Sequence, residues 1–137
     1  MQYGNMGCDG GRVDYAFQYV RDKGIGNKSQ NCLKKRGFKI KGYVDIPKGN
    51  ITALANALHI QPISVAVDAT DWQLYAGGIF NNCKKRLNHA VLLVAYDAQG
   101  WTIKNSWGDS WGENGFMRLA RGDTCGISQM ASYSLPP

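Results

Sequence analysis

The sequence contains no apolar run of the roughly twenty residues that a membrane-spanning helix requires. Its first five residues have neither the charged start nor the apolar core of a signal peptide. No two cysteines are separated by only two residues, and the 2 histidines are too few and too scattered for a zinc site. We therefore expect no membrane span, no metal and no cofactor.

The sequence also lacks internal repeats, low-complexity segments and linkers. Its 137 residues suffice for one domain, and 44% hydrophobic with 19% charged residues is typical of ordered globular proteins. Acidic residues are few, 10 against 16 lysines and arginines, which gives a net charge of +6. The basic clusters are Lys34-Lys35-Arg36 with Lys39 and Lys41, and Lys84-Lys85-Arg86. No nucleic-acid recognition motif accompanies these clusters, so we expect solvated surface and no nucleic-acid partner.

Cysteines and sequons bear on the compartment. The four cysteines are Cys8, Cys32, Cys83 and Cys125. They allow three complete pairings, and the residues alone do not choose between them. Two sequons begin at Asn27 and Asn50 and would accept glycans on a secretory route, although Asn50 would equally serve as the cap of a helix. Together these features favour an oxidising compartment.

The spacing of apolar residues predicts a helical region followed by strands. One helical face carries Val13, Ala16, Phe17 and Val20, and Gly24 ends that helix. Residues 24–37 are expected to form a loop. A second helix would begin after Asn50, with its inward face made by Ile51, Leu54, Ala55 and Leu58.

Five segments have the pattern of strands: residues 38–45, 63–67, 90–95, 101–104 and 116–119. The segment 63–67 alternates between apolar and small residues, whereas 90–95 is continuously apolar and predicts a fully buried strand. Residues 105–114 form a loop rich in glycine and tryptophan between two of these strands. The sum predicts an α+β fold in which one or two helices precede an antiparallel sheet that could close into a barrel.

Two polar residues stand at strand ends, where functional sites are often built. His89 opens the strand that continues with the apolar segment 90–95, and Asn105 follows the segment 101–104 directly. A side-chain amide oxygen can accept a hydrogen from one imidazole nitrogen and thereby fix the tautomer of the ring. Taken singly, His89 fits better a partly buried structural histidine, and Asn105 a turn residue.

The combination of motifs is more specific than its parts. The three main segments are Asn88-His89-Ala90-Val91, Lys104-Asn105-Ser106-Trp107-Gly108 and Trp111-Gly112-Glu113-Asn114-Gly115-Phe116. Further matches are Gly7-Cys8-Asp9-Gly10-Gly11, Gln61-Pro62-Ile63-Ser64-Val65, Gln73-Leu74-Tyr75-Ala76-Gly77-Gly78-Ile79-Phe80 and Cys125-Gly126-Ile127. In order, spacing and flanking residues the whole chain resembles the papain and cathepsin family of cysteine proteases.

This resemblance implies that residues 1–137 are the C-terminal part of a papain-like peptidase domain. Residues 1–37 would form the cleft edge, a helix and a loop, and residues 38–137 the antiparallel, barrel-like domain. The helical domain of the family would be mostly absent from these 137 residues.

The resemblance also implies a Cys-His-Asn mechanism, in which a cysteine thiolate attacks a peptide carbonyl. His89 would hold a proton and give it to the leaving amine, and Asn105 would orient His89. Trp107 would shield the bond between these two from water, and Trp111 would form a wall beyond the scissile bond. Substrate-binding residues implied in this way are Gly10, Gly11, Val13, Ala66, Leu87, Asn88, Ala90, Trp111 and Met130. The pocket residues among them are apolar, which predicts a preference for a bulky apolar side chain.

The resemblance assigns no residue of this sequence to the catalytic cysteine. The family carries it in a Cys-Gly-Ser-Cys-Trp-like segment upstream of the Gly7-Cys8 motif, and the printed residues start six residues before that motif. The resemblance pairs Cys83 with Cys125 and leaves Cys8 and Cys32 without their family partners. Asn88 stands where many relatives have aspartate, and the segment after Gly24-Ile25 is shorter than is usual.

Three functions follow as expectations. The chain would be the His- and Asn-bearing part of a cysteine endopeptidase that acts on peptides or proteins, with a companion chain supplying the cysteine. Alternatively it would be an inactive pseudoprotease in a larger assembly, or a secreted module that holds peptides without cleaving them. In the first case the chain would be inactive by itself. The family resemblance implies a lysosomal, vacuolar or secreted setting.

Overall fold

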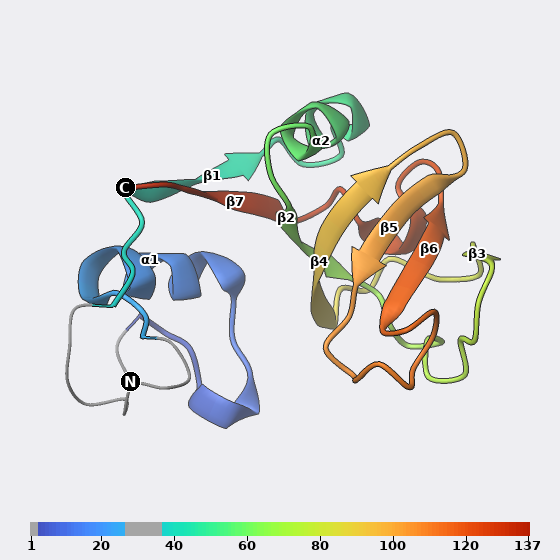
Figure 1. Ribbon diagram of the computed structural model, residues 1–137, viewed down its shortest axis with the longest axis horizontal. Coiled ribbons are helices and arrows are strands. Elements are labelled where there is room, and N and C mark those ends of the chain that lie inside the picture. Colours follow the sequence, from blue (N-terminus) through green and yellow to red (C-terminus); the bar gives the residue numbers. More distant parts are fainter. Residues whose placement is uncertain (1–2, 27–36) are drawn as a thin grey trace. The chain divides into compact units, whose positions relative to one another are not determined.

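The computed structural model describes residues 3–26 and 37–137, which form two compact units (Figure 1). The first unit is drawn from Met1–Val44 and Ser132–Pro137, and the second is Asp45–Ala131. The boundary between the two units therefore falls between residues 44 and 45. Strands β1 (Gly42–Ile46) and β7 (Ala131–Leu135) are neighbours in the sheet, so the C-terminal residues join the N-terminal unit.

The first unit contains a 3₁₀ turn, η1 (Gly7–Asp9), and one helix, α1 (Val13–Lys23). The helix ends as predicted at Gly24, whose amide donates to the Val20 carbonyl at 2.9 Å while its φ of 81° suits glycine. The predicted apolar face is present but buries none of its residues. Phe17, on this face, stacks on Tyr43 with ring centroids 5.7 Å apart.

The second unit contains helix α2 (Ile51–Leu58), strands β2 (Ile63–Val67), β3 (Ile79–Phe80), β4 (His89–Tyr96), β5 (Gly100–Lys104) and β6 (Phe116–Ala120), and the 3₁₀ turn η2 (Thr124–Gly126). The predicted cap of α2 is confirmed, because Asn50 Oδ1 accepts a hydrogen bond from Ala53 N at 2.9 Å. The strands follow in the order β2-β4-β5-β6-β3, and all pairs are antiparallel except β3 with β6.

The α+β class is confirmed, and the sheet is open instead of closing into a barrel. Strand β3 has β6 as its one neighbour in the described part of the chain. With two residues it offers too few backbone groups to pair on both sides, and the positive-φ glycines Gly77 and Gly78 precede it directly.

The core of this unit comes from alternate residues of its strands. Side chains with no exposed surface include Leu54, Ile63, Val65, Leu93, Trp101, Ile103, Met117 and Leu119. Strand β2 alternates as expected, with its odd-numbered residues buried. The prediction of a fully buried strand over 90–95 is wrong: only Val91 and Leu93 are buried there, because one face of β4 is left outside the core. In the described ranges no helix has the length and hydropathy to cross a bilayer.

Candidate active site

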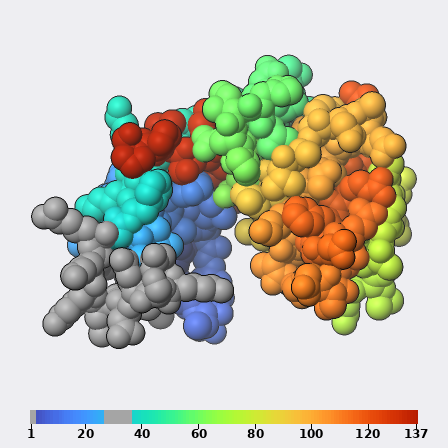
Figure 2. All heavy atoms as spheres, in the orientation of Figure 1, coloured from blue at the N-terminus to red at the C-terminus, as the bar shows by residue number. Residues whose placement is uncertain are grey.

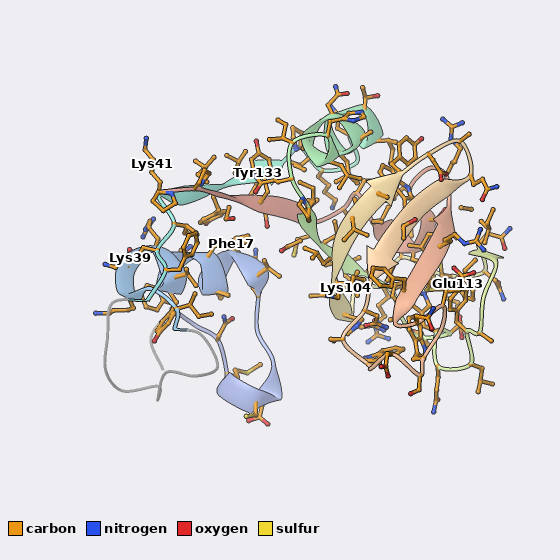
Figure 3. The ribbon with its side chains drawn as sticks, viewed as in Figure 1. Phe17, Lys39, Lys41, Lys104, Glu113 and Tyr133 are labelled. Atoms are coloured by element: carbon orange, nitrogen blue, oxygen red, sulfur yellow. A yellow bond between two sulfur atoms is a disulfide. The ribbon has the colours of Figure 1, made fainter. Side chains whose placement is uncertain are left out.

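Two side chains from neighbouring strands meet at one end of the sheet. His89 is the first residue of β4, and Asn105 follows Lys104, the last residue of β5 (labelled in Figure 3). His89 Nε2 lies 2.8 Å from Asn105 Oδ1. The antiparallel pairing of β4 with β5 brings the start of one strand to the end of the other, so residues sixteen apart in sequence become partners.

The hydrogen bonds around Asn105 determine which imidazole nitrogen donates. Ser106 N, which can only donate, lies 2.8 Å from Asn105 Oδ1 and so fixes the orientation of the amide. Because Oδ1 is an acceptor, His89 Nε2 must carry the hydrogen of their shared bond. Nδ1 is thereby left as the nitrogen that exchanges a proton with a reacting group.

Trp107 lies against this pair. Its ring centroid is 5.0 Å from that of His89, with the two planes tilted by 31°. Trp107 is 42% exposed while Asn105 is only 8% exposed. The ring contact agrees with the predicted position of Trp107, and its shielding of the His89–Asn105 bond from water stays a prediction.

Trp72, which the sequence analysis did not single out, is the centre of the aromatic cluster here. It is fully buried, and its ring meets those of His89 at 6.3 Å, Trp107 at 6.5 Å and Trp111 at 6.4 Å. Its carbonyl also accepts a hydrogen bond from Trp111 Nε1 at 3.1 Å. One sequence signal could have indicated Trp72. It stands three residues before Tyr75, in the segment between β2 and the glycines Gly77 and Gly78.

The loop between β5 and β6, orange in Figure 2, is held by hydrogen bonds of Glu113, which lies two residues after Trp111. Arg118 donates from both Nε and Nη2 to the carboxylate of Glu113, at 2.9 and 2.7 Å. Glu113 also accepts from Gly78 N at 3.1 Å. At Gly112 (φ 57°) a Cβ would lie 2.6 Å from the carbonyl of Phe116, so the loop needs glycine there.

The Glu113 carboxylate, labelled in Figure 3, gives these hydrogen bonds a pH dependence. Its bonds to Arg118, followed by that to Gly78 N, lower the pKa of Glu113 from 4.5 to about 2. A lowered folded-state pKa contributes stability above the unfolded value and loses it as pH falls through the folded value. We expect Glu113→Gln to make the free energy of unfolding fall less steeply between about pH 4.5 and 2.

Urea unfolding at a series of pH values measures this slope. Asp109→Asn is the control, because it removes an exposed carboxylate from the same loop. Equal slopes for the wild type and Glu113→Gln would show that the bonds to Arg118 do not persist in solution.

The structure brings together three of the predicted specificity-pocket residues. Ala66 and Ala90 are Cα partners on β2 and β4, on the face opposite the buried residues of β2. Ala66 N donates to the Met130 carbonyl at 2.9 Å. Leu87, half-buried, lies two residues before His89 and within reach of Gly126. Leu87 and the three residues that meet all belong to the second unit, and their role as a specificity pocket stays a prediction.

The predicted residues Gly10, Gly11 and Val13 belong to the first unit, and their part in the site stays a prediction. Locally, Asn5 accepts from Arg12 N at 2.7 Å and donates to the Arg12 carbonyl at 3.2 Å. Its side chain occupies the space that a Cβ at Gly11 would need. Glycine at this position therefore has a local structural reason.

The disulfide prediction is confirmed for one pair. Cys83 and Cys125 are bonded, with Cα atoms 5.1 Å apart. Cys8 is free and exposed in η1, whereas Cys32 lies outside the described residues, as does the sequon residue Asn27. Asn50 is exposed, and its oxygen caps α2.

The comparisons with known proteins agree with this geometry. The sequence matches the family model described as papain family cysteine protease over residues 1–135. It is 43% identical over 145 residues to cathepsin L 2 of Paramecium tetraurelia, covering 97% of this chain and 46% of that protein. It is 38% identical over 159 residues to a cathepsin L-like peptidase of Aedes aegypti, covering 98% of this chain and 47% of that one. The chain spans about half the length of the curated relatives it matches.

Solved structures extend the likeness to the fold. The Carica candamarcensis cysteine protease CMS1MS2, solved in complex with E-64, superposes with a TM-score of 0.90 at 34% identity, covering 96% of this chain and 71% of that one. Digestive procathepsin L 3 of Tenebrio molitor gives a TM-score of 0.84 at 41% identity, covering 97% of this chain and 51% of that one.

Proposed function

Because the chain belongs to the papain family of cysteine proteases, we propose that it supplies the histidine and asparagine of a cysteine-type endopeptidase. The observation that carries this proposal is the 2.8 Å bond between His89 Nε2 and Asn105 Oδ1, with Trp107 against the imidazole. A histidine with one nitrogen fixed and the other available is what a proton-transfer partner of a thiol requires.

In the proposed reaction, a thiolate attacks the carbonyl carbon of a peptide and forms a thioester as the C–N bond breaks. His89 gives its Nδ1 proton to the departing amine. It then takes a proton from the water that attacks the thioester, so that the acid product leaves and the thiolate is restored beside the protonated His89. Asn105 holds the ring orientation through both steps, because its oxygen accepts from Nε2 whichever state Nδ1 is in.

The proposed substrate carries a bulky apolar side chain beside the scissile bond. Ala66, Ala90 and Met130 are apolar and lie together next to His89, and Leu87 approaches from the same segment. No charged side chain is among these four, so a cationic substrate group would lose water there without gaining a partner.

A companion segment would supply the thiol. Cys83 and Cys125 are bonded to each other, and the sequence contains no Cys-Gly-Ser-Cys-Trp-like segment. Among the described residues of the first unit, large apolar side chains are exposed at Met6, Tyr19, Ile25 and Phe38. A helix with no buried residue beside exposed apolar side chains is the surface expected where another segment packs. The disulfide supports an oxidising setting, a lysosomal, vacuolar or secretory one.

A thiol-reactive epoxide tests the proposal on native material. We expect the label on a cysteine outside these 137 residues. The segment that carries this cysteine should show in the intact mass of the native material, as a mass above 15.1 kDa before or after reduction. Peptide mapping distinguishes this from a label on Cys8, which is free and exposed.

Two results would overturn the proposal. One is a label confined to Cys8. The other is absence of label and of peptide hydrolysis in an assembly with a folded partner of unrelated sequence. Either would favour the alternative of an inactive pseudoprotease that acts as a structural or binding subunit.

A further inference from the structure

A buried carboxylate that the proposed reaction does not use directly follows Val67, the Cα partner of His89. Asp68 directly follows β2 and is 2% exposed. Its Oδ1 accepts from the Thr70 hydroxyl at 2.6 Å and from Thr70 N at 3.1 Å, and its Oδ2 accepts from Arg86 N at 2.9 Å. These bonds, that of the Thr70 hydroxyl first, lower the pKa of Asp68 despite its burial.

The ionised carboxylate determines the direction of the next hydrogen bonds. The Thr70 hydroxyl has a single hydrogen, and Asp68 accepts it. The Thr70 oxygen is therefore an acceptor for its other neighbour, Asn88 Nδ2, at 2.9 Å. Ala69 N donates to Asn88 Oδ1 at 2.9 Å, which fixes the amide the same way round. Residue 88 must therefore both donate and accept, as an amide does and a carboxylate does not.

This network fastens the segment before His89 to the turn after β2. Four hydrogen bonds join the two: Arg86 N to Asp68, Asn88 N to the Val67 carbonyl, and the two bonds of the Asn88 side chain. Val67 is also the Cα partner of His89 in the β2–β4 pair. The same turn leads into Trp72, whose ring contacts His89.

We propose that Asp68, Thr70 and Asn88 are positioning residues that set the placement of the His89 ring, and that asparagine at 88 is required by this network. The proposal rests on the proposed function for its kinetic consequence, although the placement itself is testable without activity. A shift of about 1 Å in a reacting group can cost on the order of a hundredfold in rate. Such a shift changes the chemical step, while substrate contacts elsewhere stay as they were.

The test compares Thr70→Val, which keeps the shape and loses the hydroxyl, with Thr70→Ser, which keeps the hydroxyl. In the complete enzyme we expect Thr70→Val and Asn88→Asp each to lower kcat about tenfold, with KM within about twofold of the wild-type value. The separate variant Thr70→Ser should have the kcat of the wild type. Thr102→Val is the matched control, since Thr102 lies on β5 of the same unit and its hydroxyl forms none of the hydrogen bonds described. Its kcat should equal that of the wild type.

An NMR experiment on the chain separates this proposal from the proposed function. The chain has 2 histidines, so the His89 ring signals are assigned with His59→Gln, and the His59 signals serve as an internal reference. Thr70→Val should move the His89 signals, and Thr70→Ser should leave them in place. Unmoved His89 signals in a folded Thr70→Val variant, or wild-type kcat in Asn88→Asp, would overturn the proposal. An inactive wild type whose signals respond as expected would count against the proposed function alone.

Discussion

His89→Ala is expected to lower kcat/KM of the complete enzyme by about 10³-fold, since general acid–base catalysis by a positioned group is worth about 10²–10⁴-fold. The thiol loses its proton partner, and the leaving amine loses the group that protonates it. Steady-state hydrolysis of a peptide with an apolar side chain beside the scissile bond measures the effect. The expected loss exceeds that of Thr70→Val because it removes the reacting group itself.

His59→Ala is the matched control for this experiment. His59 is the other histidine of the chain, exposed at the C-terminal end of α2 and within the same unit. Its replacement should leave kcat/KM unchanged. A His89→Ala enzyme that keeps more than about a tenth of wild-type activity would show that another group transfers the proton.

Trp72→Ala is expected to cost about 3–5 kcal/mol of stability, the range for truncating a large buried aromatic side chain. Trp72 has no exposed surface, and its ring contacts His89, Trp107 and Trp111. Removing it leaves a cavity beneath the imidazole, so the rate should fall as well. Urea unfolding of the chain measures the stability change.

Trp72→Phe distinguishes the ring from its polar atom. Trp72 Nε1 is buried and has no hydrogen-bond partner among the described residues, so phenylalanine removes an unsatisfied donor while it keeps an aromatic face. We expect this variant to lose less than about 1.5 kcal/mol. Trp107→Ala offers a contrast, because a side chain that is 42% exposed should cost less stability on truncation. A Trp72→Ala protein as stable as Trp107→Ala would contradict the central place assigned to Trp72.

The aromatic cluster and the polar network act on different parts of His89. The buried Trp72 and the partly exposed Trp107 both contact the His89 ring through their aromatic rings. The polar network instead binds Asn88, the residue that precedes His89 at the start of β4. Stability measurements should therefore respond most to the aromatic residues, and kcat at constant stability to Thr70 and Asn88.

The sequence by itself determined much of the second unit. Period-two alternation placed 63–67 on a strand, and the Asn50 cap set the start of α2, because both signals depend on local geometry. The pairing of His89 with Asn105 was inferred from motifs in order and spacing, and so was the Cys83–Cys125 bond. These are properties that short segments carry within themselves or repeat among relatives.

Only the tertiary structure decided what depends on groups distant in the chain. The open sheet, the exposed face of β4 and the lack of buried residues in α1 depend on which neighbours each element finds. The roles of Trp72, Asp68 and Thr70 are of the same kind, since each of them bonds to at least one residue 18 or more positions away. The sequence around a residue does not determine whether its side chain is buried or which hydrogen bonds it forms. Both properties arise only when segments that are distant in the chain pack together.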